Sequence, residues 1–226
     1  MADADYRAEN NNTAWLATGG PATRLILLRH GVTAYSIQKR FAGRSDLPLL
    51  PLGQAQAELG ARRVIELGPP AAIIASPLTR TRQTAAALAE ATGLAVQLDE
   101  GLIETDYGEW DGFLLEEVRQ KFPDVVAGWL TDAGLVPPGG ESLARTAARV
   151  LAARDRIVAS YTGRTVAVVT HVSPIKALVT DAVGAPVLAA HRMYLAPASV
   201  TVIEYFGDDT TSLRSYNDTA HLDGLA

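Results

Sequence analysis

The chain has 226 residues, of which 48% are hydrophobic, and it carries a formal net charge of −5 and no cysteine. This size suffices for one large domain, and the acidic balance implies no general affinity for nucleic acids or acidic membranes. The lack of cysteine excludes disulfides, thiol nucleophiles and cysteine-bound zinc, and no stretch approaches the length of a membrane span. Without a secretory signal, a cytoplasmic protein is expected.

Residues 1–23, which are rich in Asn, Ala and Gly, predict a flexible N-terminal arm or linker, and residues 24–226 predict a single domain. Apolar and helical stretches then alternate along the chain. Strands are expected at about 24–29, 71–75, 94–98, 165–170, 198–205 and 211–216. Helices are expected at 53–67, 77–93, 141–161 and 174–183, with shorter ones between 113 and 135.

Apolar strands that alternate with helices indicate an α/β fold. We predict a three-layer α/β/α domain with a mostly parallel central sheet, because such strands are buried on both faces. The apolar sheet edge near residues 198–216 is a candidate surface for a homodimer.

The first functional signal is the sequence LILLRHG at residues 25–31. An apolar run that ends in Arg29 and His30 indicates a buried strand with polar groups at its carboxyl end, where ligands bind in open α/β sheets. Arginine offers phosphate a forked donor, and histidine can attack phosphorus or donate a hydrogen bond. The alternative is a solvated pair of side chains at a strand end.

Two further segments follow expected strands. ASPLTRTRQTA at 75–85 places Arg80 one turn into a helix, although an ordinary exposed helix would also show Arg80 and Arg82. In VAVVTHVSPIKAL at 166–178, His171 follows an apolar strand directly, as His30 does. A buried structural histidine is the alternative for each singly, but two histidines at two strand ends are a rarer coincidence.

An acidic loop, LIETDYGEWDG at 102–112, completes the set. Glu104 follows two apolar residues and is the best candidate for a shielded acid that protonates a leaving group, the alternative being a solvated acidic turn. Two histidines, two arginines and one glutamate from strand–helix turns describe a phosphoryl-transfer site. A neutral imidazole would be the nucleophile, and the cationic groups would make a metal or cofactor unnecessary.

These motifs resemble those of the histidine phosphatase superfamily, also called phosphoglycerate-mutase-like, from about Arg24 to Tyr216. The resemblance implies that His30 forms a phosphohistidine and that Arg29 and Arg80 bind the phosphate. It also implies that Glu104 is the proton donor and His171 the second catalytic histidine.

The resemblance extends to further phosphate or substrate contacts. These are Thr33 and Ser36, then Arg40 and Gly43 of the RFAG segment, Glu141 and Ser142 of the lid-like PGGES segment, and Val172. Two of the departures from the family pattern bear on these contacts. Ser36 stands where Asn is common, and Val172-Ser173 stands where Gly-Gly is common, so the backbone N–H of Val172 remains available to phosphate.

Only 66 residues separate Glu104 from His171, and they contain no adjacent Arg-Arg pair. This favours a metal-independent phosphomonoesterase over a phosphoglycerate-mutase-type transferase, with a non-catalytic phospho-ligand-binding domain as a third possibility. The segments most resemble α-ribazole phosphatases (CobC-like) and acid phosphatases, so α-ribazole 5′-phosphate is a candidate among small phosphorylated metabolites. They also resemble the module that follows RNase H in some actinobacterial bifunctional proteins.

The remaining candidates are one lysine and two histidines. Lys176 lies just over one helical turn after His171 and either faces the site or lies on the surface. His191 and His221 lack a strand-end context and are expected to be solvated.

Overall fold

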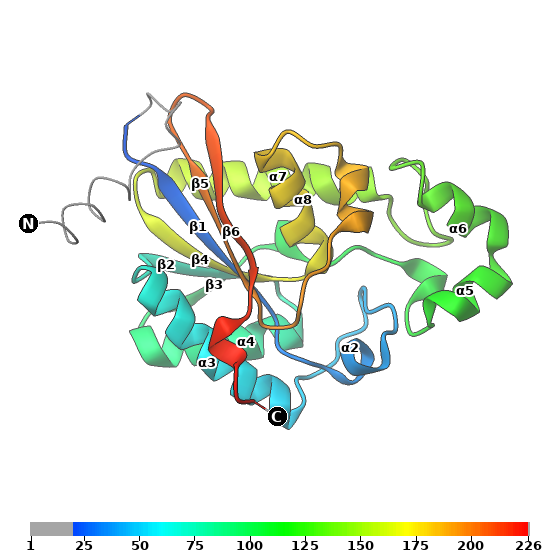
Figure 1. The fold of residues 1–226 in the computed structure, drawn as a ribbon, viewed down its shortest axis with the longest axis horizontal. Coiled ribbons are helices and arrows are strands. Elements are labelled where there is room, and N and C mark those ends of the chain that lie inside the picture. Colours follow the sequence, from blue (N-terminus) through cyan, green and yellow to red (C-terminus); the bar gives the residue numbers. More distant parts are fainter. Residues whose placement is uncertain (1–19, 226) are drawn as a thin grey trace, which may run out of the picture.

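The computed structural model describes residues 20–225, so the predicted arm at 1–23 lies outside the described residues except for its last four (Figure 1). A single six-stranded sheet has the order β3-β2-β4-β1-β5-β6. The strands are β1 (Thr23–Arg29), β2 (Ala72–Ala75), β3 (Val96–Leu98), β4 (Thr165–Thr170), β5 (Val200–Tyr205) and β6 (Thr211–Asp218). The first four pair in parallel, whereas β5 and β6 add antiparallel pairs, which confirms a mostly parallel sheet.

Helices cover both faces of the sheet, as predicted (Figure 1). One face packs against α3 (Pro51–Leu67) and α4 (Thr79–Thr92), and the other against α7 (Leu143–Ser160) and α8 (Val172–Ala182). Alternate residues of β1 serve the two layers: Leu25 and Leu27 join the α7–α8 side, and Ile26 and Leu28 join the α3–α4 side. Burial on both faces explains why the strands read as continuous apolar runs.

Two short helices, α5 (Leu115–Lys121) and α6 (Pro123–Trp129), lie to one side of the sheet and its covering helices (Figure 1). We call residues 113–130 the cap. The cap packs through an aromatic cluster in which Trp110 is fully buried between Phe41 and Trp129. An isolated bridge between Arg40 and Leu114 ties the cap to the segment that follows β1.

Short elements complete the chain: α2 (Ala34–Gln38) and the 3₁₀ turns η1 (Glu100–Leu102), η2 (Gly108–Trp110), η3 (Val187–Arg192) and η4 (Ala220–Leu222). Of the helices in the described part of the chain, none is long and apolar enough to cross a membrane. β6 forms one edge of the sheet, and its residues are mostly half-buried. Pairing of two subunits at this edge stays a prediction.

Each of the four long helices starts two residues away from its expected position, and two of these shifts bear on the site. α4 begins at Thr79 instead of Pro77, because Asp46 from a distant loop accepts hydrogen bonds from the Thr79 N–H (2.6 Å) and hydroxyl (2.7 Å). α8 begins at Val172, two residues early, directly after His171. The early start turns the first N–H groups of α8 toward the strand end, where they meet the acidic loop.

Candidate active site

His30 follows the last residue of β1 and is only 4% exposed. Its Nδ1 lies 2.8 Å from the Gly31 carbonyl oxygen, and because a carbonyl only accepts, Nδ1 donates and Nε2 keeps a free lone pair. Burial, together with the positive charges of Arg80 and Arg29, lowers the pKa of His30 well below 6.5. The imidazole is therefore neutral at physiological pH, which is the state that a nucleophile requires.

The turn after His30 depends on a close approach between two glycines. A Cβ atom on Gly31 would lie 2.2 Å from the Gly53 carbonyl oxygen, and one on Gly53 would lie 2.3 Å from the Val32 carbonyl oxygen. Helix α3 thus packs backbone to backbone against the turn that carries the candidate nucleophile, and no side chain fits between them.

Arg29 and Arg80 place two guanidinium groups beside this histidine. Arg29 donates from Nη1 to the Leu195 carbonyl, while its buried Nε has no hydrogen-bond partner among the described residues. Burial lowers the pKa of Arg29 to about 10, so the group remains charged at neutral pH. Arg80 is fully buried and donates to the carbonyl oxygens of Ser45 (2.7 Å) and Gly43 (2.9 Å).

His171 packs edge-on against His30, with 5.2 Å between the ring centroids. Its Nδ1 accepts a hydrogen bond from Arg80 Nε (3.2 Å), so Nε2 carries the proton and donates to Ser76 Oγ (2.7 Å). Burial is the main cause that lowers the pKa of His171, and Arg80 adds to it. Both ring nitrogens are occupied by protein groups, which fix the orientation of this second histidine.

Glu104 is 4% exposed, so the prediction of a shielded acid is confirmed. Its carboxylate accepts hydrogen bonds from the backbone N–H groups of Thr105 (2.9 Å), Val172 (3.0 Å) and Ser173 (3.1 Å). The last two are the first residues of α8, whose N-terminus favours a negative charge. The Val172 N–H, which the sequence assigned to phosphate, is instead used by Glu104.

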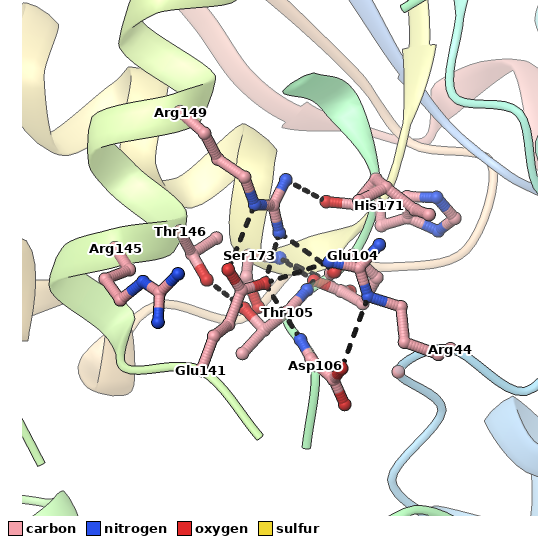
Figure 2. A network of polar contacts seen from close by, with 12 residues as sticks. Arg44, Glu104, Thr105, Asp106, Glu141, Arg145, Thr146, Arg149, His171 and Ser173 are labelled. Atoms are coloured by element: carbon pink, nitrogen blue, oxygen red, sulfur yellow. Dashed lines mark hydrogen bonds and ion pairs between the residues drawn. The ribbon is translucent and has the colours of Figure 1, made fainter. Parts of the chain in front are cut away.

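A clamp centred on Arg149 of α7 holds the chain on either side of Glu104 (Figure 2). Arg149 donates to the carbonyl oxygens of Gly101 (3.0 Å), Ile103 (2.6 Å) and Glu104 (2.9 Å). It also forms an ion pair with Glu141, whose carboxylate accepts the Asp106 N–H (2.9 Å). Desolvation raises the pKa of Glu141, but the Arg149 and Asp106 contacts outweigh it and leave that pKa below 4.5.

Glu141 and Ser142, which the resemblance assigns to substrate binding, make structural contacts here, and their part in substrate binding stays a prediction. Glu141 is committed to Arg149 and Asp106, and Ser142 caps α7 by accepting the Arg145 N–H (3.2 Å). The PGGES segment braces the acidic loop instead. The Glu109 N–H donates to the Pro138 carbonyl (2.9 Å), and a Cβ on Gly108 would lie 2.1 Å from that same oxygen.

A cavity of about 270 Å³ opens at the ends of the strands. Arg29, His30 and Glu104 line it together with Tyr107, and Val172 also faces it. Arg80 and His171 are not among its lining residues. They are fully buried and lie behind the residues that line the cavity. The cavity has room for a phosphate group and a small alcohol portion.

The remaining predicted contacts divide into two groups. Thr33 and Ser36 line the cavity but form the capping box of α2, in which the Ser36 hydroxyl accepts the Thr33 N–H (2.7 Å). Arg40 lines the cavity and pairs with Glu117 (3.2 Å). Gly43 does not line it, and acts through its carbonyl, which holds Arg80.

The prediction that His191 and His221 are solvated is wrong. Both are half-buried, and burial lowers the pKa of each. His221 Nε2 donates to the Ala198 carbonyl (3.0 Å), and the His191 ring packs against Trp129 with 4.3 Å between centroids. Neither contact leaves a local pattern in the sequence, because the partners are far apart along the chain or lie in the irregular cap.

The amino-acid sequence is similar to those of known proteins. The model of the histidine phosphatase superfamily (branch 1) matches residues 25–219. The chain is 40% identical to Bifunctional protein Rv2228c of Mycobacterium tuberculosis over 92% of its length, but it spans only 57% of that relative. It is 32% identical to Phosphoserine phosphatase 1 of Hydrogenobacter thermophilus, covering 88% of this chain and 94% of the relative.

Solved structures of phosphatases have a similar fold. A mycobacterial glucosyl-3-phosphoglycerate phosphatase superposes with a TM-score of 0.79 at 32% identity, over 88% of this chain and all of the other. The α-ribazole phosphatase from Shigella flexneri has a TM-score of 0.77 at 21% identity, covering 87% of this chain and 96% of the other, and this likeness concerns the fold alone. The family model and the relatives together cover nearly the whole described chain, and the chain therefore belongs to the histidine phosphatase superfamily, branch 1.

Proposed function

We propose that this chain is a metal-independent phosphomonoesterase of the histidine acid phosphatase type, acting on small phosphorylated metabolites. The observation that carries the proposal is the neutral His30, whose free Nε2 shares one cavity with the Arg29 guanidinium and the Glu104 carboxyl group. A lone pair, a cation for the phosphate and an acid for the leaving group are the three requirements for cleaving a phosphate ester.

The reaction would proceed in two displacements. In the first, which starts with Glu104 protonated, His30 Nε2 attacks phosphorus, the P–O bond to the alcohol breaks, and Glu104 gives its proton to the leaving oxygen. In the second, Glu104 takes a proton from water, which attacks the phosphohistidine and releases inorganic phosphate. Arg29, backed by buried Arg80, balances the negative charge on the phosphoryl oxygens throughout, a role that metal ions fill in other phosphoryl-transfer enzymes.

Hydrolysis is preferred over mutase-type transfer for two reasons. The chain has no Arg-Arg pair between Glu104 and His171 to hold a second anionic group. Two of the compared proteins of at least 30% identity are named as phosphatases, one of phosphoserine and one of glucosyl-3-phosphoglycerate. Both named substrates are phosphate esters that also contain a carboxylate. α-Ribazole 5′-phosphate stays in the substrate panel on the strength of the sequence motifs.

The proposal extends to the parent protein. The chain spans 57% of a relative that is named bifunctional, and the sequence resembles a module that follows RNase H. An RNase H domain in the same reading frame would support this fusion, and an upstream frame that encodes a different domain would contradict it.

The test is phosphate release in EDTA from p-nitrophenyl phosphate, phosphoglycerates, phosphoserine, nucleotides, sugar phosphates and α-ribazole 5′-phosphate. We expect EDTA-resistant release and an alkali-stable, acid-labile phosphoenzyme after quenching with labelled ester. Exchange of phosphate between phosphoglycerates that outruns release would favour the mutase alternative. Tight phosphate binding without turnover of any ester would favour a binding domain.

The pH dependence gives a second test. Attack requires neutral His30, and its pKa lies well below 6.5 because the ring is buried beside two guanidinium groups. A lowered pKa keeps the imidazole unprotonated as pH falls, so we expect the acid-side decline of kcat/KM to lie well below pH 6.5. Profiles over about pH 4 to 9 for two esters of different phosphate pKa separate enzyme from substrate ionisation. A decline toward acidic pH that both esters share and that is centred at or above pH 6.5 would contradict the assignment.

A further inference from the structure

The Arg29 side chain is held by a single carbonyl group. The Leu195 carbonyl oxygen accepts a hydrogen bond from Arg29 Nη1, and the Arg29 side chain makes no other hydrogen bond within the part of the chain that the structure describes. Its guanidinium is desolvated and is repelled by the like charge of Arg80, and Glu104 attracts it only through space. The direction of the guanidinium therefore depends on the placement of the Leu195 carbonyl.

Two consecutive residues of β6 fix the chain around that carbonyl. The Leu195 carbonyl and the Ala196 N–H belong to one peptide group, which is planar. Asn217 Oδ1 accepts the hydrogen bond of this N–H (2.7 Å), so the Asn217 amide sets the plane in which the carbonyl points. On the other side of Leu195, the Tyr216 hydroxyl donates to the Tyr194 carbonyl (2.6 Å).

The backbone of β6 is irregular where it supplies these contacts. The register between β5 and β6 shifts between Val200 and Val202, and Asn217 has a left-handed backbone with φ 56°. Bulges next to active sites re-aim side chains, and asparagine tolerates the left-handed region better than most residues. We infer that the bulge aims the Asn217 amide at the peptide group after Leu195.

We propose that Asn217 is a positioning residue for Arg29. Its amide oxygen sets the direction of the Leu195 carbonyl, and this carbonyl sets where the Arg29 guanidinium meets the phosphate. The inference rests on the proposed phosphomonoesterase function, in which Arg29 binds the phosphoryl oxygens. It gives the edge strand β6 a part in the site, although β5 separates it from β1 in the sheet.

Replacement of Asn217 by glycine tests the assignment. Asn217→Gly removes the amide and keeps an unstrained backbone, because glycine adopts positive φ freely. We expect the Kd of inorganic phosphate and the KM of p-nitrophenyl phosphate to rise about fivefold to tenfold, with kcat within about threefold of wild type. Arg29 holds the phosphoryl oxygens before and during the displacement, so its misplacement weakens binding. A variant that is only less well folded would show a lower kcat and an unchanged KM.

A chemical readout needs neither ligand nor turnover. Phenylglyoxal is an uncharged reagent that modifies accessible arginines, and mass mapping of the peptide that contains Arg29 gives the rate at this residue. Asn217→Gly should raise that rate about tenfold, because the guanidinium loses its fixed partner. Asn217→Asp should keep the wild-type rate, because its carboxylate accepts the same hydrogen bond from Ala196.

Asp209→Gly is the matched control. Asp209 also has a left-handed backbone (φ 62°), and it lies in the turn between β5 and β6, at the opposite end of β6 from Asn217. This variant should match the wild type in phosphate Kd, in KM and in the reactivity of Arg29.

The outcomes separate the two proposals. Wild-type values of Kd, KM and Arg29 reactivity in Asn217→Gly would overturn the positioning role, and so would an Asn217→Asp variant whose Arg29 reacts as fast as in Asn217→Gly. A wild type that hydrolyses no ester would contradict the phosphatase proposal alone. The reactivity of Arg29 would still decide the role of Asn217, because it requires no bound ester.

Discussion

Replacing His30 with alanine is expected to lower kcat for every phosphomonoester by at least about 10⁴-fold, because the variant has no atom that can form the covalent intermediate. The cavity keeps Arg29 and Glu104, so inorganic phosphate should still bind. Phosphate release in EDTA measures the first effect, and calorimetric titration with phosphate measures the second. Labelled ester should also leave no alkali-stable label on the variant.

His221→Gln is the matched control for this experiment. His221 is a half-buried histidine outside the active-site cavity, and glutamine can still donate to the Ala198 carbonyl that His221 contacts. The control should retain activity and label. Residual activity of His30→Ala above about one per cent of wild type would show that another group is the nucleophile, provided that thermal unfolding confirms an intact fold.

Glu104→Gln is expected to act selectively on esters with poor leaving groups. An alkoxide needs a proton as it departs, whereas p-nitrophenolate is stable without one, so loss of the acid should cost alkyl phosphates about 10² to 10⁴-fold and p-nitrophenyl phosphate far less. The measurement is kcat/KM for p-nitrophenyl phosphate and for glycerol 3-phosphate in the same preparation.

The near-normal hydrolysis of p-nitrophenyl phosphate serves as the internal control for folding. A folding control is needed because the Glu104 carboxylate accepts hydrogen bonds from the N–H groups of Thr105, Val172 and Ser173. The NH₂ group of glutamine would face one of these donors and could not accept its hydrogen bond. Equal losses on both esters would reject Glu104 as the leaving-group acid and would indicate a structural role.

The sequence predicts the fold and the centre of the site because both arise from local patterns. A strand buried on both faces must be apolar throughout, and a polar residue that follows such a strand must lie at the sheet edge. His30 and His171 satisfy this rule on β1 and β4, which are paired neighbours in the sheet. The shielding of Glu104 follows in the same way from the two apolar residues before it.

The contacts that support the cavity-lining residues join distant segments of the chain, so they leave no local pattern in the sequence. Arg149 lies more than forty residues from the carbonyls that it holds, and Asp46 caps a helix that starts at Thr79. The PGGES segment has the composition of a lid, yet its glycines serve close backbone packing against the acidic loop. Composition alone does not separate a glycine needed for motion from one needed for contact.

The Arg149 clamp also separates two tasks within the molecule. The acidic loop is fastened to α7 and to the start of α8, both of which cover one face of the sheet, while the cap over residues 113–130 joins the site through the Arg40–Leu114 bridge and the aromatic cluster. Substitutions in the cap can therefore reshape the entrance without moving Glu104. A scaffold divided in this way lets substrate preference drift between relatives while the bond-breaking chemistry is inherited intact.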